Sequence, residues 1–206
     1  MSETTQKKNA ASKPLHVLTI HTLLWALLLA VAGVFITFTA SWATYQAKVD
    51  AEAETDVFKT FSLKTLDGGT LEAQELSKTS LTAINIWGTD CPPCIGELPD
   101  LETLNNSYDD SQFRVIGIPI DVTTHGKEII EDRLKEANRI LEASNVTYVN
   151  LIADEKMDTF VKSIILGTPT TFFIDKEGEI IYTVTGSRDL DYWKNTVDEL
   201  LKERKQ

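Results

Sequence analysis

The feature that most constrains this chain is a long apolar stretch near its N-terminus. From Pro14 to Ala47 the sequence contains no Asp, Glu, Lys or Arg. Leu18 to Phe38 would form a helix of roughly 31 Å at about 1.5 Å per residue, which matches the hydrocarbon core of a bilayer. We therefore predict a single transmembrane anchor in residues 18–40, which leaves residues 57–206 for one folded domain.

The charges that flank the apolar stretch predict its orientation. The lysines before it are Lys7, Lys8 and Lys13, and the carboxylates after it are Asp50, Glu52, Glu54 and Asp56. Because cationic flanks remain in the cytoplasm, we expect residues 1–17 to be cytoplasmic and residues 41–56 to be a linker to an extracytoplasmic domain. A cleaved signal peptide is the alternative, since Ser41-Trp42-Ala43 resembles a cleavage site. The apolar stretch, however, exceeds the about 7–15 residues typical of signal peptides.

The domain itself is acidic. Residues 1–47 carry three lysines and Glu3, a net charge of +2, so the other residues carry −13 to give the total of −11. An acidic domain does not favour binding to nucleic acid or docking on anionic lipid. We therefore expect no nucleic-acid partner, and contact with the membrane only through the chain's own anchor.

A closely spaced cysteine pair is the main chemical motif. Cys91 and Cys94 are the only cysteines, with Pro92 and Pro93 between them. At this spacing one sulfur can attack a disulfide and the other can resolve the mixed disulfide. The pair follows the apolar run 81–87 and precedes an amphipathic segment, so we expect Cys91 at a helix N-terminus, where a thiolate is stabilised. Prolines suit the first helical turn because the amide hydrogens there lack intrahelical partners.

Two other uses of the pair are weaker. A zinc site usually needs four ligands, and His125 is the only histidine outside the apolar N-terminal segment. A purely structural disulfide would close a very small loop and remove little entropy from the unfolded chain. We therefore predict a redox-active disulfide, with no metal and no other cofactor.

The pattern after residue 57 predicts an α/β domain, with a central mixed sheet and helices on both faces. The expected strands are 58–63, 70–71, 81–87, 113–120, 149–152, 170–174 and 179–184, and the expected helices are 95–104, 128–144, 158–164 and 190–201. Pro169, in the segment Gly167-Thr168-Pro169-Thr170, enters a strand, and we predict a cis peptide bond before it.

Together these segments resemble the thioredoxin superfamily and, within it, the membrane-anchored TlpA-like thiol-disulfide oxidoreductases of bacteria, which include reductases of cytochrome c maturation. The resemblance covers roughly residues 57–203. The matching segments are 86–89, the cysteine motif 91–94, Glu97-Leu98-Pro99, 117–121, 167–175 and Gly178. The resemblance implies a thioredoxin-like fold preceded by a single transmembrane helix.

The resemblance also implies roles for individual residues. Cys91 would be the attacking thiolate and Cys94 the resolving thiol, and the Pro169 loop would lie against the disulfide and present its backbone to substrate. Glu97 would tune the thiols or shape the substrate groove, and a solvated carboxylate in the first helical turn is the alternative. The other matched residues expected to tune the thiols or line the groove are Trp87, Pro92, Pro93 and Thr168.

Asp90 departs from the family pattern, because many relatives carry an aromatic residue immediately before the first cysteine. A carboxylate beside Cys91 disfavours the thiolate unless it points to solvent or caps backbone amides. Asp90 also removes an apolar contact from the rim at which substrate would bind.

The resemblance implies a reductase, tethered to the bacterial cell membrane, that acts on disulfides in exported proteins, apocytochrome c among them. A membrane thiol electron donor would reduce it again. A disulfide-forming oxidase and a noncatalytic binding module are the alternatives. Reducing and oxidising couples differ by about 150 mV, or roughly 7 kcal/mol, and no sequence pattern resolves that difference.

Overall fold

The computed structural model describes residues 15–204. Lys7, Lys8 and Lys13, on which the predicted orientation depends, lie outside the described residues. The chain divides into two compact units, residues 1–50 and 51–206, which are described separately.

The described residues of the N-terminal unit form one long helix. This helix, α1 (Leu15–Thr55), runs without interruption and therefore includes most of the predicted linker 41–56. Among the described residues, Thr22–Trp42 is long and apolar enough to cross a membrane, and it overlaps the predicted anchor 18–40. A continuous helix suits this segment because the backbone polar groups of a membrane span must bond within the segment itself.

A four-stranded mixed sheet forms the centre of the second unit. Its strands, in spatial order, are β4 (Phe113–Pro119), β3 (Leu81–Trp87), β7 (Thr170–Asp175) and β8 (Ile180–Thr185). β3 pairs in parallel with β4 and antiparallel with β7, and β7 pairs antiparallel with β8. Every residue of β3 is buried, because it lies between two strands and both faces of the sheet are covered.

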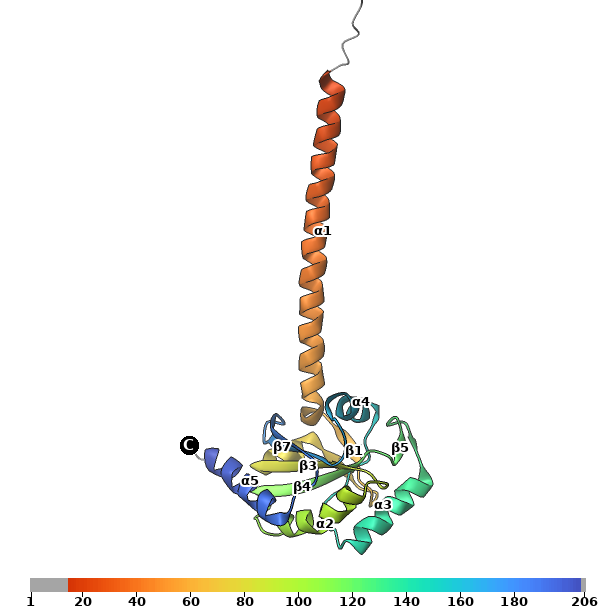
Figure 1. Ribbon diagram of the computed structural model, residues 1–206, viewed down its shortest axis with the longest axis vertical. Coiled ribbons are helices and arrows are strands. Elements are labelled where there is room, and N and C mark those ends of the chain that lie inside the picture. The colour runs from red at the N-terminus through yellow and green to blue at the C-terminus, as the bar shows by residue number, and fades with distance from the viewer. Residues whose placement is uncertain (1–14, 205–206) are drawn as a thin grey trace, which may run out of the picture. The chain divides into compact units, whose positions relative to one another are not determined.

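Helices cover both faces of this sheet. They are α2 (Pro92–Asn105), α3 (Glu131–Ala143), α4 (Glu155–Ile164) and α5 (Leu190–Glu203), with two short 3-10 helices, η1 (Asp56–Lys59) and η2 (Ala73–Lys78). Leu81 and Ala83 pack with α2, α3 and α5, whereas Ile84 and Ile86 pack with α4, η1 and η2 on the opposite face. Figure 1 shows α2, α3 and α5 on one side of the sheet and α4 on the other. The predicted α/β architecture is confirmed.

Two predicted strands differ from the structure. Segment 58–63 begins inside η1, and only its end joins β1 (Ser62–Lys64), which forms a hairpin with β2 (Thr70–Glu72). Segment 149–152 is not a strand, because it forms isolated bridges, Asn150 with Gly117 and Leu151 with Thr65, and no continuous ladder. Leu151 donates to the carbonyl of Gly117 in β4, whereas Ile152 donates to that of Lys64 in β1. The segment therefore links the hairpin to the sheet.

One predicted helix begins later than expected. Glu128–Ile129 form β6, which pairs with β5 (Thr123–Thr124), so α3 starts at Glu131 with Ile130 as its N-cap. Ala137, Ile140 and Leu141 form the buried face of α3.

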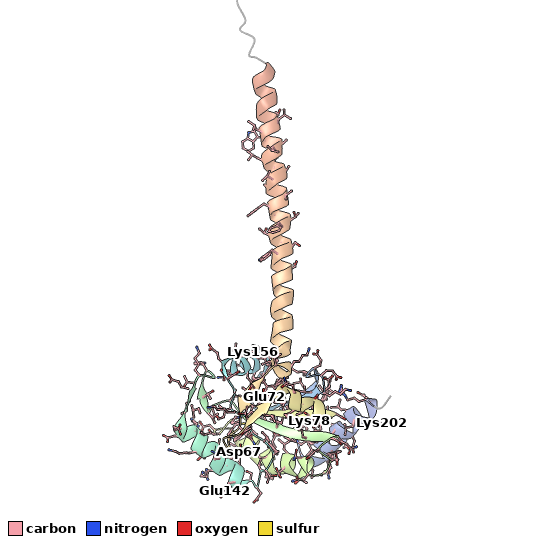
Figure 2. All side chains as sticks on the ribbon, turned by 180° about the vertical axis from the view of Figure 1, so that it is seen from behind. Asp67, Glu72, Lys78, Glu142, Lys156 and Lys202 are labelled. Atoms are coloured by element: carbon pink, nitrogen blue, oxygen red, sulfur yellow. A yellow bond between two sulfur atoms is a disulfide. The ribbon has the colours of Figure 1, made fainter. Side chains whose placement is uncertain are left out.

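Most charged side chains lie on the outside of the domain. Figure 2 labels Asp67, Glu72, Lys78, Glu142, Lys156 and Lys202, all of which are exposed. Among the described residues, the buried carboxylates are Glu97, Glu102, Asp158 and Asp175. Because an unpartnered buried charge is costly, each of these requires a specific environment.

Candidate active site

The two cysteines lie at the strand-to-helix turn that the sequence predicts. Cys91 is the N-cap of α2, Pro92 and Pro93 occupy its first turn, and a disulfide joins Cys91 to Cys94 with their Cα atoms 5.3 Å apart. Both prolines are exposed. Cys91 is only partly buried, whereas Cys94 is completely buried. An incoming molecule can therefore approach the Cys91 sulfur, while the Cys94 sulfur faces the protein interior.

The Pro169 loop lies against this disulfide. The Thr168–Pro169 peptide bond is cis, as predicted. The carbonyl oxygen of Thr168 lies 3.6 Å from Cys91 Sγ, and the loop is held by Thr170 Oγ1, which donates to the carbonyl of Gly167 at 2.7 Å. Two residues before Thr168, the side chain of Leu166 is 96% exposed. The loop thus places a polar backbone group and an exposed apolar side chain beside the accessible sulfur.

Glu97 is not the solvated first-turn carboxylate of the alternative reading. Its side chain is only 3% exposed, because Glu97 lies on the face of α2 that packs against the sheet. Asn85 Nδ2 donates to Glu97 Oε1 at 3.0 Å, and the backbone N–H of Arg188 donates to Oε2 at 3.3 Å. Burial nevertheless dominates these two bonds and the charge of Arg188, and it raises the pKa of Glu97 to about 7.

Sequence reasoning did not identify Asn85. This residue lies in the buried central strand β3, and its Nδ2 also donates to Thr171 Oγ1 of β7 at 3.0 Å. Its Oδ1 has no hydrogen-bond partner among the described residues. An amide side chain inside a fully buried strand was the available signal, because a buried polar group needs a hydrogen-bond partner.

Trp87 is not positioned to line a substrate groove. Its side chain is fully buried, and its Nε1 donates to Asn150 Oδ1 at 3.0 Å. Gly117 lies beside this bond, because a Cβ there would be 2.0 Å from Asn150 Oδ1. Trp87 therefore fixes the end of β3 from inside the domain, and the expected groove role is wrong for this side chain.

Asp90 points outward and pairs with an arginine that the sequence did not identify. Its side chain is 74% exposed, and its Oδ2 lies 2.5 Å from Arg133 Nη1 of α3. Asp90 was expected either to point to solvent or to cap backbone amides. Among the described residues it accepts no hydrogen bond from a backbone amide, so the structure has the arrangement in which Asp90 points to solvent. Arg133 lies 43 positions away in sequence, which is why the pair was not anticipated.

The described residues contain no metal-type cluster. No group of three or more His, Cys, Asp or Glu side chains in the described part of the chain could hold a metal ion. Among the described residues, the reactive groups at this site are the two sulfurs and the ionisable side chains around them.

Comparisons with known proteins agree with this geometry. The family model described as "AhpC/TSA family" matches residues 55–183. Sporulation thiol-disulfide oxidoreductase A of Bacillus subtilis is 23% identical over 139 residues, which cover 68% of this chain and 78% of the relative. Thiol-disulfide oxidoreductase ResA of Halalkalibacterium halodurans is 28% identical over 126 residues, covering 61% and 65%. A solved thiol:disulfide interchange protein from Chlorobium tepidum is similar in fold, with a TM-score of 0.58 at 23% identity, covering 69% of this chain and 93% of that one.

Proposed function

Because the chain belongs to the AhpC/TSA family and is a thiol-disulfide oxidoreductase with a thioredoxin-like fold, we propose that it is a membrane-tethered reductase of disulfides in exported proteins. The unequal access to the two sulfurs is the observation that carries this proposal. Cys91 is open to a partner, and Cys94 is buried behind it, which is the arrangement that an attacking and a resolving cysteine need.

The reaction is a pair of thiol-disulfide exchanges. The Cys91 thiolate attacks one sulfur of the substrate disulfide, and the other substrate sulfur leaves as a thiolate, which gives a mixed disulfide. The Cys94 thiolate then attacks Cys91 Sγ, which releases the second substrate sulfur. The substrate disulfide gains two electrons and two protons to become a dithiol, and the Cys91–Cys94 dithiol becomes the disulfide of the structure.

Several features support Cys91 as the first nucleophile. As N-cap of α2 it lies at the positive end of a helix macrodipole, which favours a thiolate. The carbonyl of Thr168 beside it can accept a hydrogen bond from the backbone N–H of an extended substrate segment. These features do not depend on the identity of the substrate, for which apocytochrome c is one candidate.

The reaction would take place outside the cytoplasm. The apolar segment Thr22–Trp42 supports an anchor, and the lysines before it support a cytoplasmic N-terminus. Regeneration of the dithiol then needs electrons that cross the membrane, so we propose a membrane thiol protein as donor. An alkaline phosphatase fusion after residue 206 should be active in bacterial cells, and an inactive but stable fusion would contradict this orientation.

Trapping tests the proposed reaction. Replacement Cys94→Ser removes the resolving thiol, so mixed disulfides between Cys91 and its substrates should accumulate and should disappear on reduction. The matched control is the double variant Cys91→Ser/Cys94→Ser, which should trap nothing. Absence of any trapped protein, with no reduction of a model protein disulfide by the unchanged chain, would refute a catalytic function and favour a noncatalytic binding module.

The direction of the reaction follows from its potential. We expect the Cys91–Cys94 couple, equilibrated with glutathione, to have a potential well below about −150 mV. A value above about −150 mV would favour a disulfide-forming oxidase instead.

A further inference from the structure

Charged side chains from two other elements hold the short segment that precedes Cys91. Asp121, just after β4, accepts hydrogen bonds at its Oδ2 from the backbone N–H of Thr89 at 2.8 Å and from Thr89 Oγ1 at 2.6 Å. Arg133 Nη1 of α3 donates to Thr89 Oγ1 at 2.9 Å and lies 2.5 Å from Asp90 Oδ2. We refer to Thr89, Asp90, Asp121 and Arg133 as the Arg133 cluster.

The carboxylates of this cluster lie beside the turn that carries Cys91. Asp90 adjoins Cys91 in sequence. Asp121 approaches Cys91 across Gly88, since a Cβ added to Gly88 would lie 3.7 Å from Asp121 Oδ2 and 3.9 Å from Cys91 Cβ. Arg133 Nη1 is 3.8 Å from Asp121 Oδ2, so one guanidinium contacts both carboxylates.

The other ionisable groups near Cys91 do not replace this cation. Glu97, on the buried face of α2, adds a third carboxyl group. Arg188, in the segment before α5, interacts with Glu97 through its backbone N–H and its charge. The Pro169 loop, residues 166–170, has no ionisable side chain and places the backbone carbonyl of Thr168 beside Cys91. Removal of Arg133 would therefore leave Asp90 and Asp121 unopposed beside Cys91, and like charges disfavour ionisation of a thiol.

We propose that Arg133 is a positioning residue of the redox site, which neutralises Asp90 and Asp121 and holds the segment before Cys91 so that the reduced cysteine can carry its negative charge. This inference rests on the proposed function only in taking Cys91 as the attacking thiolate. It also gives the carboxylate of Asp90, immediately before Cys91, a counter-charge in Arg133.

The alternative is an ordinary surface ion pair with no influence on the sulfur. Side chains of Arg133 and Asp90 are 38% and 74% exposed, so water and salt screen their charges, and the effect on Cys91 should be moderate. The same helix offers a matched control in Arg139, which pairs with Glu136 at 2.6 Å and makes no described contact with residues 88–91.

The test measures the thiol pKa of Cys91 in the reduced full chain in detergent micelles, from the pH dependence of alkylation by iodoacetamide. We expect Arg133→Gln to raise this pKa by about 0.5, which lowers the thiolate fraction about threefold at a pH below the pKa. Asp90→Asn should lower the pKa, and the double variant should lie between the two single variants. Arg139→Gln should match the unchanged protein, and about 1 M salt should reduce the effect of Arg133→Gln.

Further variants separate charge from folding. Arg133→Lys keeps the positive charge, so the pKa of Cys91 should stay close to its value in the unchanged protein. If Arg133→Gln does not fold, Arg133→Lys and Asp90→Asn still test whether these charges influence Cys91. An unchanged pKa in both Arg133→Gln and Asp90→Asn, or an equal shift in Arg139→Gln, would overturn the role of Arg133. Such a result would not affect the trapping of substrates by Cys94→Ser. If Cys94→Ser traps no substrate although Arg133 is present, that failure counts against the proposed function itself.

Discussion

The buried carboxyl group of Glu97 should make the stability of the domain depend on pH. Burial raises its pKa from 4.5 to about 7, even though Asn85 and the backbone of Arg188 donate hydrogen bonds to it. In Glu97→Gln the shape is kept but the titration is lost. We therefore expect the stability of the unchanged protein to fall, relative to the variant, as the pH rises.

The direction and the size of this change in the free energy of unfolding follow from the two pKa values of Glu97, in the folded and in the unfolded chain. Because the folded-state pKa lies above the unfolded value, the folded chain holds this proton more tightly, and the contribution to stability is complete below pH 4.5 and lost as pH rises through about 7. At about 1.36 kcal/mol per pKa unit, the full change is about 3 kcal/mol, of which about 2.5 kcal/mol falls between pH 5 and pH 8.5. Loss of the Arg188 bond in the variant affects all pH values alike, so the difference between the two profiles isolates the titration.

Urea denaturation of the oxidised full chain in detergent, followed by tryptophan fluorescence from pH 5 to pH 8.5, provides the measurement. The oxidised form is used because neither cysteine titrates in a disulfide. Glu136→Gln, at a surface glutamate of α3, is the control and should give a profile parallel to that of the unchanged protein. If the Glu97→Gln profile is also parallel, burial does not raise the pKa of Glu97 and the reasoning fails.

Three further substitutions test how the site is supported. Glu102→Gln should cost about 2 kcal/mol in urea denaturation, because the Glu102 carboxylate accepts hydrogen bonds from the backbone and hydroxyl of Thr147. Burial alone would raise the pKa of Glu102, but its hydrogen bonds outweigh burial and lower this pKa below 4.5. The ionised carboxylate therefore stabilises the fold above pH 4.5, and the destabilisation caused by Glu102→Gln should shrink as the pH falls further. A destabilisation that stays constant in acid would contradict the lowered pKa of Glu102. Gly117→Ala should lower thermal stability by about 2–4 kcal/mol, because the new Cβ would lie 2.0 Å from Asn150 Oδ1, and an unchanged melting temperature by circular dichroism would argue against that close approach. Tyr148→Phe should change stability by less than about 1 kcal/mol, since the buried hydroxyl has no partner among the described residues, and a loss of more than about 2 kcal/mol would reveal a bond that the structure lacks.

The sequence predicted the local features of the site well. The cysteine turn, the prolines in its first helical turn and the cis bond before Pro169 were all expected from short segments, and the structure contains them. Each depends on the conformational limits of proline or on the periodicity of neighbouring residues, which act over a few positions.

The long-range contacts could not be predicted in the same way. Asn85 meets Glu97 because β3 and α2 pack face to face, and Arg133 meets Asp90 because α3 begins near the cysteine turn. Neither partner is fixed by local pattern. Segment 149–152 has the composition of a strand, yet it makes isolated bridges to Gly117 and Thr65 in place of a ladder, because position in the fold overrides β-propensity.

The burial of Cys94 has a consequence for oxidative damage. In the reduced protein a small oxidant such as peroxide meets the partly buried Cys91 before the fully buried Cys94, and the sulfenic acid formed at Cys91 lies next to a second sulfur. Condensation of the two cysteines expels water and restores the disulfide before a second oxidation can produce an irreversible sulfinic acid. We therefore expect peroxide to return this protein to its ordinary oxidised state, whereas Cys94→Ser should accumulate the overoxidised form.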